Sequence, residues 1–294
     1  MASLDGDNNA PRPGAWLSDI AYSHESTVAA FKSYYEFLAN MYMDPDMIKT
    51  PPATGWAHIT PESMQALGKS EKVITLQRHL PYVSWAQGEP EIHSAAACTF
   101  VDWERIARNI AGRAHGDLVL YTMEPAHTPP HVVGISEGPY KMLLDTKLGM
   151  VHFTGGPTLF HDDPGQPIQP IQDDPYDYAP EEEDWRLNSA WPIADFFEVL
   201  KRQFINLDYV PLSNRIVEEV YLGDEEEGDV LGHEGACRVG ACRIGQEIFW
   251  RHGWSLFDQF RKEDCVAELE GTIAERFPGH FWPEWMETQR DLDV

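Results

Sequence analysis

The strongest hydrophobic pattern in the chain lies between Asp117 and Leu207, where strand-like segments precede one amphipathic helix. The segments DLVLYTM, HVVGI and YKMLLD-TKLG-MVHF predict strands, and the last of them predicts a hairpin with Gly149 in its turn. The segment WPIADFFEVLKRQFINL then carries an apolar stripe at helical spacing, formed by Ile193, Phe196, Phe197, Leu200, Phe204 and Leu207. This order predicts an α+β fold, with a mixed or antiparallel sheet of about four to six strands covered by helices and followed by a helical C-terminal extension.

Shorter helices are predicted on both sides of this region. An apolar face from Val28 to Tyr42 ends at Pro45, and capping residues mark three further starts, at Thr60, Ser70 and Asp102. Residues 86–98 have no periodic pattern and are expected to be irregular. Near the end of the chain we expect helices around residues 246–252 and over residues 262–277, and an exposed ion pair of Glu198 with Arg202 on the main helix.

The polar segments suggest how the domain is bounded. Residues 1–22 are rich in Asp, Asn, Pro and Gly and predict a flexible tail. Residues 23–207 are expected to form one α+β domain, which contains an acidic, proline-rich loop at 155–184. Residues 208–294 are expected to add an acidic loop and a helical extension packed on the same domain, with a tandem pentapeptide, ACRVG-ACRIG, at 236–245.

Composition narrows the classes of partner. The chain has 294 residues, 48 acidic and 22 basic, and a formal net charge of −26. Such a field repels phosphate backbones and anionic lipid surfaces, so neither nucleic acid nor a membrane is an expected partner. The N-terminal segment lacks the basic and apolar regions of a signal peptide, and four cysteines in a chain of this length do not form a disulfide framework. Together these features predict a cytoplasmic protein.

Three groups of residues could bind a cation. His233, Cys237, Cys242 and His252 offer four zinc ligands, although their spacing matches no standard zinc motif and a loop with incidental thiols is the favoured alternative. The pair His127 and His131 is separated by prolines that preclude a helix. Acidic residues gather in two short stretches, His161-Asp162-Asp163 and Asp173-Asp174, where a solvated loop is favoured. We therefore assign no metal.

Catalytic and cofactor motifs are missing from the sequence. There is no Gly-x-Ser-x-Gly elbow, no Gly-x-Gly-x-x-Gly and no P-loop, so no cofactor is expected. His79 could act as a base, but a structural histidine is the favoured interpretation. The chain contains 10 Trp, 11 Tyr and 13 Phe, and three of these aromatic residues, Tyr82, Trp85 and Trp103, flank the irregular segment. We select these three as candidate ligand-binding residues, with core packing as the alternative.

Three segments resemble the SUKH-type superfamily, which includes the yeast cell-wall-synthesis regulator and bacterial toxin-immunity proteins. They are ALGKSEKVITLQRHLPYV, the hairpin YKMLLDTKLGMVHF and the helix WPIADFFEVLKRQF, and the resemblance covers roughly residues 27–207. The chain is also similar to a large set of uncharacterised fungal cytosolic proteins that continue with a HGW segment, here residues 251–254, and an RKE-x-C helix, here residues 261–265. Residues 208–294 depart from the basic superfamily pattern. The resemblance implies an α+β fold and protein binding without catalysis.

Two functions follow as alternatives. The first is a non-enzymatic protein-interaction or regulatory module, whose acidic loops suit a basic protein partner. The second is a cofactor-independent enzyme, such as a cyclase or isomerase, that holds a small apolar metabolite in an aromatic-lined pocket and needs only a few polar groups.

Overall fold

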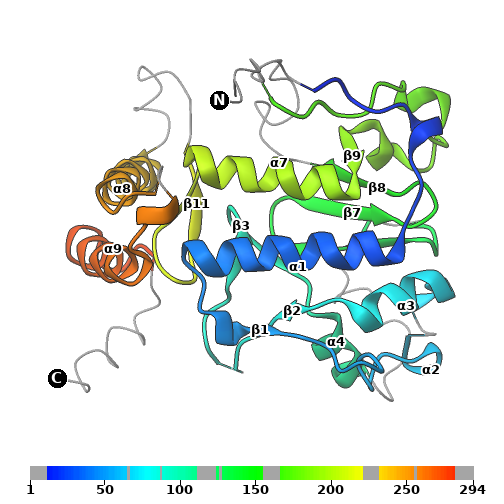
Figure 1. The fold of residues 1–294 in the computed structure, drawn as a ribbon, viewed down its shortest axis with the longest axis horizontal. Coiled ribbons are helices and arrows are strands. Elements are labelled where there is room, and N and C mark those ends of the chain that lie inside the picture. Colours follow the sequence, from blue (N-terminus) through cyan, green and yellow to red (C-terminus); the bar gives the residue numbers. More distant parts are fainter. Residues whose placement is uncertain are drawn as a thin grey trace, which may run out of the picture. The chain divides into compact units, whose positions relative to one another are not determined.

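A computed structural model describes residues 12–64, 67–86, 88–110, 124–125, 128–154, 166–220, 232–254 and 257–281. Its fold is α+β, as the sequence predicts, with a helical C-terminal region (Figure 1). The described chain forms two compact units. The first, here called unit 1, is drawn from residues 1–35, 48–84 and 100–201, and the second, unit 2, from residues 36–47, 85–99 and 202–294. The domain boundaries expected from the sequence stay a prediction.

Among the described residues, the helices and strands are short apart from α1, α7, α8 and α9. The α-helices are α1 (His24–Met41), α2 (Pro61–Met64), α3 (Glu71–His79), α4 (Trp103–Ile110), α7 (Ile193–Asn206), α8 (Gly232–Arg251) and α9 (Lys262–Arg276). The strands are β1 (Ile48–Lys49), β2 (Tyr82–Val83), β3 (His93–Ala95), β4 (Cys98–Phe100), β5 (Val132–Gly134), β6 (Ser136–Glu137), β7 (Lys141–Asp145), β8 (Met150–Thr154), β9 (Ala190–Pro192), β10 (Tyr209–Pro211) and β11 (Val217–Glu219). Short 3-10 helices are η1 (Leu17–Asp19), η2 (Pro45–Met47), η5 (Pro175–Asp177), η6 (Asp184–Leu187) and η8 (Phe257–Gln259).

Unit 1 is built on an antiparallel sheet in the order β5-β7-β8-β9. The predicted hairpin is confirmed: β7 and β8 pair in register from Lys141↔Thr154 to Asp145↔Met150, and Gly149 has φ +77° in the turn. The strand β9, which the sequence did not predict, is the edge strand of this sheet within the described part of the chain, so the missing N–H of its Pro192 is tolerated.

Helix α7 covers this sheet with the predicted apolar stripe. All six stripe residues are buried, and the Phe196 ring packs on Phe153 of β8 and on Trp191 of β9. Helix α1 lies beside α7 (Figure 1), where the rings of Phe31 and Phe197 meet with their centroids 4.6 Å apart. Aromatic packing of this kind stabilises the unit by more than its buried area alone.

Two sequence predictions are wrong in detail, one about an ion pair on α7 and one about the N-terminal tail. Glu198 forms its ion pair with Lys201, at 2.7 Å, and not with the expected Arg202. Residues 12–22, which the sequence places in a tail, are hydrogen-bonded to the rest of unit 1: the Arg12 N–H donates to the Pro167 carbonyl at 2.7 Å. Residues 1–11 lie outside the described residues.

Unit 2 contains the β10–β11 hairpin and the helices α8 and α9, which lie side by side (Figure 1). Gly245 allows close packing, since a Cβ at this position would lie 2.6 Å from Val210 and 3.7 Å from Leu269. The Trp254 ring contacts those of Phe249 and Phe260, and its indole N–H donates to the Phe204 carbonyl at 3.1 Å. Helix α8 is much longer than the predicted segment, and β3 and β4 occupy part of the segment expected to be irregular.

Candidate functional site

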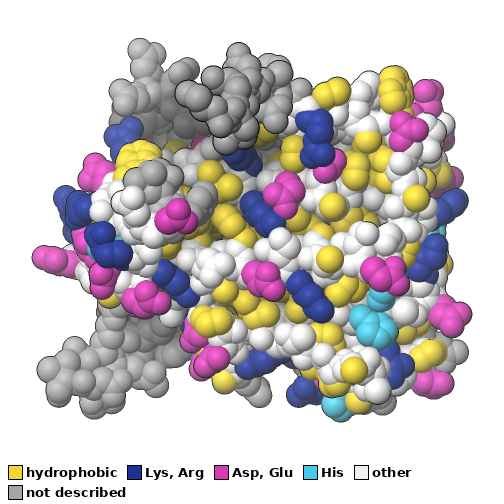
Figure 2. Space-filling model, in the orientation of Figure 1, with side chains coloured by type: hydrophobic (Ala, Val, Ile, Leu, Met, Phe, Trp, Pro, Cys, Tyr) yellow, Lys and Arg dark blue, Asp and Glu magenta, His cyan; other side chains and the backbone are white. Residues whose placement is uncertain are grey.

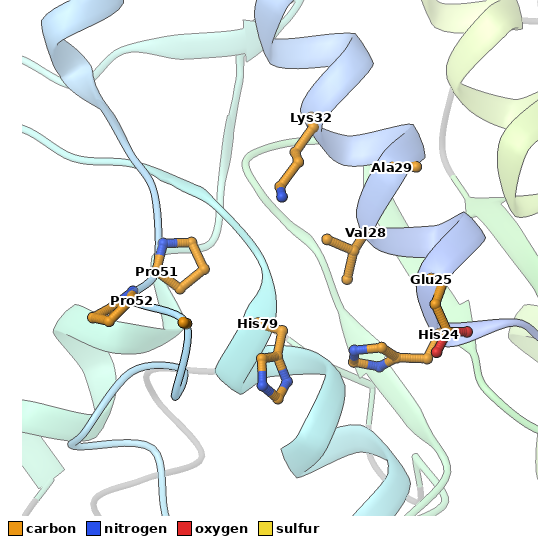
Figure 3. Close-up of a pocket in the computed structure, with 9 residues that line it drawn as sticks. His24, Glu25, Val28, Ala29, Lys32, Pro51, Pro52 and His79 are labelled. Atoms are coloured by element: carbon orange, nitrogen blue, oxygen red, sulfur yellow. The ribbon is translucent and has the colours of Figure 1, made fainter.

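An open groove of about 420 Å³ in unit 1 is lined by four titratable side chains, two of them histidines (Figure 3). Helix α1 forms one wall, the end of α3 forms another, and an extended proline segment closes the third side. The lining residues are His24, Glu25, Val28, Ala29, Lys32, Pro51, Pro52, Ala53 and His79. In the surface view, histidine side chains gather where the N-terminal part of α1 lies beside α3 (Figure 2).

Local sequence explains each wall. The α1 positions 24, 25, 28, 29 and 32 follow helical spacing, so they share one face. Ser23 begins this helix, because its hydroxyl accepts the Ser26 N–H at 3.2 Å. The third wall contains Pro51 and Pro52, which preclude a helix.

The proline segment is held against α3 at Arg78. The Arg78 carbonyl accepts the Trp56 N–H at 2.9 Å, and the Arg78 side chain donates to the Thr54 carbonyl at 3.1 Å. Gly55 makes this contact feasible: it has φ +77°, and a Cβ there would lie 2.4 Å from Arg78. Since Arg78 precedes His79, the same contacts position the imidazole in the groove.

The two histidines meet edge to face. Their ring centroids are 5.2 Å apart and the planes cross at 87°. The Nδ1 of His79 lies 2.8 Å from the Thr75 carbonyl, which can only accept, so Nδ1 carries a proton and donates it to this carbonyl. Partial burial, and then the neighbouring His79, lower the pKa of His24 from its ordinary value of 6.5. His24 is therefore uncharged at neutral pH.

The remaining lining residues combine a small apolar surface with two opposite charges. Val28, Ala29 and the Pro51–Ala53 segment supply the apolar part. Glu25 and Lys32 are both exposed and lie two helical turns apart, roughly 10 Å along the α1 axis. No Phe, Tyr or Trp is among the described residues that line the groove.

The aromatic residues selected from the sequence lie elsewhere. Tyr82 is 2% exposed in β2 and its hydroxyl donates to the Gln77 carbonyl, while Trp103 is 1% exposed and its indole N–H donates to the Gly134 carbonyl at 3.1 Å. Both belong to the core of unit 1. Trp85 is half-buried and belongs to unit 2. Ligand binding by these residues stays a prediction.

The sequence indicates His79 as a candidate base but gives no indication of His24. No local signal links the two, because tertiary packing of α1 on α3 alone brings them together.

The proposed zinc ligands separate in the structure. Cys237 lies 3.6 Å from His280, the Cys242 thiol donates to the Glu219 carbonyl at 3.7 Å, and His252 contacts Glu268 at 2.7 Å. The His233 side chain lies outside the described residues. Across the described ranges, no three His, Cys, Asp or Glu side chains form a group that could hold a metal ion.

The other two predicted cation groups are only partly described. Residues 161–163 and His127 lie outside the described residues. Asp174 caps η5 by accepting the Tyr176 N–H at 2.9 Å, and Asp173 accepts the Leu17 N–H. His131 instead joins the buried charge network described next.

A second polar cluster, here called the Asp145 network, is buried between the end of β7 and η6 in unit 1. Asp145 is fully buried; one of its oxygens accepts the Lys147 and Leu148 N–H groups at 2.6 and 2.9 Å, and the other accepts Arg186 at 2.7 Å. Arg186 also pairs with Glu183 and lies 4.4 Å from the Trp185 ring. These contacts hold the β7–β8 hairpin to η6.

Histidines flank the Asp145 network. His131 lies 3.8 Å from the Asp145 carboxylate. His152 is fully buried against Trp185, and neither ring nitrogen has a hydrogen-bond partner within the described part of the chain. Burial, and then Arg186, lower the pKa of His152 to about 3.

No described helix is both long and apolar enough to cross a membrane. Comparison with protein-family models gives no match, and comparisons with curated proteins and with solved structures give none either. The SUKH-like resemblance therefore stays a prediction.

Proposed function

We propose that this protein is a cytoplasmic, non-enzymatic interaction module, and that its groove binds a short extended segment of a basic protein partner. The observation that carries this proposal is the lining of the groove, which combines an apolar floor with one acid and one base on α1. The four cysteines are all thiols and none forms a disulfide, which supports a reducing compartment.

The dimensions suit a short peptide segment. A groove of about 420 Å³ is within the range of small binding sites, but it is open along one side, so a continuous chain can pass through it. Pro51 and Pro52 are rigid, and binding therefore orders few side chains on this wall. Apolar contact with Val28 and the prolines would provide the desolvated centre that binding sites need.

Charge favours a basic partner and orients it. The net charge of −26 attracts a basic protein from solution and raises its association rate. Within the groove, Glu25 is the site for a cationic side chain, whereas Lys32 repels one. The uncharged His24 adds no opposing charge at neutral pH. A bound segment would therefore place its cation at the Glu25 end.

The resemblance to the SUKH-type superfamily gives independent support, because it implies protein binding without catalysis. The enzyme alternative expects an aromatic-lined pocket, and the groove has no such lining among its described residues. The interaction module is thus the function that the described geometry favours.

Photo-crosslinking at paired positions on α1 tests the proposal. A photoreactive amino acid replaces either Ala29, which lines the groove, or Ser26, which is exposed on the same helix but outside it. Each full-length variant is irradiated in an extract of the cells that make the protein, and adducts are identified by mass spectrometry. We expect the Ala29 probe to label a basic protein that the Ser26 probe does not label.

The adduct must also map to one short segment of the partner, and a synthetic peptide of that segment must bind the unmodified protein in calorimetry. Equal labelling from both positions, or a peptide that binds the Lys32→Asp variant no better than a Glu25→Lys variant, would contradict the proposal.

A further inference from the structure

Apart from the groove, unit 2 contains a cysteine and a histidine in contact, Cys237 and His280. Cys237 is on α8 and is partly exposed, and His280 is an exposed residue after the end of α9. The Cys237 Sγ and the His280 Nε2 are 3.6 Å apart, within hydrogen-bond range for sulfur. This pair is separate from the groove and plays no part in the proposed binding function.

Packing around Phe277 holds the two residues together. Helix α8 approaches this ring at Gly240, where a Cβ would lie 3.3 Å from the Phe277 Cζ. The His280 N–H donates to the Phe277 carbonyl at 3.3 Å, so the histidine follows the position of the ring. The ring of Phe281 packs edge-on against Phe277 at 6.1 Å. The geometry of the pair is therefore fixed by two helices and a turn.

The other three cysteines differ in accessibility. Cys98, Cys242 and Cys265 are all buried, with at most 1% of their surface exposed. Burial raises the pKa of Cys242 and of Cys265 to about 12. A buried thiol of that kind is inert, because the thiolate is the nucleophile and reagents cannot reach it. A reagent that enters from solvent therefore meets Cys237 first.

We propose that Cys237 is a redox modification site that exchanges with low-molecular-weight disulfides of the glutathione class, with His280 as its proton acceptor. The imidazole Nε2 takes the thiol proton, and the thiolate attacks one sulfur of the disulfide. A new S–S bond to Cys237 forms as the original S–S bond breaks. The departing thiolate takes the proton from the imidazolium, so Cys237 is oxidised to the disulfide level and the leaving half is reduced to a thiol.

The test measures the rate and site of reaction with glutathione disulfide. The native full-length protein is incubated with this reagent, quenched with acid, and analysed by intact mass and peptide mapping. We expect one adduct per chain, on Cys237, and none in the Cys237→Ser variant. In His280→Gln the adduct should form roughly tenfold more slowly at pH 7.

A matched variant and a pH series make the test decisive. His58→Gln removes an exposed histidine of unit 1 and should leave the rate unchanged. Between pH 8 and pH 6.5 the wild-type rate should fall less than the His280→Gln rate, a difference that a merely structural histidine would not produce. First adducts on Cys98, Cys242 or Cys265, or equal rates in His280→Gln and wild type, would overturn the proposal.

Discussion

The Asp145 network and the groove both contain histidine next to charged residues, but they use these groups in opposite ways. In the network, Asp145 and Arg186 are almost fully buried, and each is satisfied by protein partners. In the groove, Glu25 and Lys32 are exposed and lie at opposite ends of an apolar floor. The charges of the Asp145 network stabilise the hairpin, whereas the charges of the groove are accessible to a ligand.

The difference shows that a perturbed histidine is not by itself a functional site. His152 has the more strongly lowered pKa, yet it is fully buried on strand β8 and inaccessible to a ligand. His24 has a smaller perturbation, but it lines an open groove. Access and the surrounding lining, and not the size of the pKa change, distinguish the candidate site.

The largest expected effect is at the buried ion pair. Arg186→Met leaves the Asp145 carboxylate buried without its counter-charge, and we expect the free energy of unfolding to fall by about 3–5 kcal/mol. Urea denaturation measures this loss. The double variant Asp145→Asn with Arg186→Met should recover part of it.

A matched control for this prediction is Arg12→Met, which removes an ion pair with Asp195 in which Arg12 is 56% exposed. Its effect should be about 1 kcal/mol or less. Similar losses for Arg186→Met and Arg12→Met would show that the Asp145 network does not have the structural role assigned to it.

The next effect is the acid sensitivity that His152 confers. Its pKa in the folded state is about 3, below the ordinary 6.5, so the unfolded chain binds the proton more readily. Stability is therefore unaffected near pH 7 and is lost as pH falls from about 6.5 towards 3. Between pH 7 and pH 4 this residue alone should reduce the free energy of unfolding by about 3 kcal/mol.

His152→Leu removes this contribution and should be less acid-sensitive than wild type by that amount in urea denaturation at the two pH values. Carboxyl groups titrate equally in both proteins and cancel in the difference. Parallel pH curves for the two proteins would contradict the burial of a neutral His152.

Groove charges should have smaller effects, on binding and not on folding. Glu25→Gln and Lys32→Gln each remove one exposed charge, so the free energy of unfolding should change by less than about 0.5 kcal/mol. Affinity for the partner peptide should fall roughly fivefold in Glu25→Gln and stay equal or rise in Lys32→Gln. Calorimetry at low and high salt measures the direction of the affinity change in each variant. Equal losses of affinity in the two variants would argue against the proposed orientation.

The smallest effect is the pH dependence of binding. Because burial and His79 lower the pKa of His24, its protonation is shifted to more acidic pH, and the new positive charge beside Glu25, Lys32 and His79 opposes a cationic segment. Affinity should be constant from pH 8 to pH 7 and then fall roughly twofold by pH 5.5. His24→Asn should reduce this fall, and an unchanged pH profile in that variant would remove His24 from the site.

Helices with strong local signals were predicted well, and elements without such signals were missed. Ser70 caps α3 by accepting the Val73 N–H at 3.3 Å, and Asp102 accepts the Arg105 N–H at 2.9 Å, as capping predicts. Strands of two or three residues, such as β1 and β10, are too short to show a period of two. Helix α8 was predicted too short because its glycines reduce helix propensity.

The groove could be predicted only in part. The sequence offers His79 as one candidate base, and the helix predicted from the apolar face between Val28 and Tyr42 includes Lys32 but not Glu25. The contact of His24 with His79 depends on how α1 packs against α3, and no residue spacing specifies that packing. Non-local contacts of this kind become visible only in the folded chain.

The tandem pentapeptide in α8 shows how a helix separates two copies of one short sequence. A shift of five residues rotates a position by about 140° around the helix axis. The two copies therefore face different surroundings: Cys237 is partly exposed whereas Cys242 is buried, and Gly240 approaches Phe277 whereas Gly245 approaches Val210. Duplication of a segment at this spacing places the two copies in different environments, so the sequence repeat does not produce a structural repeat.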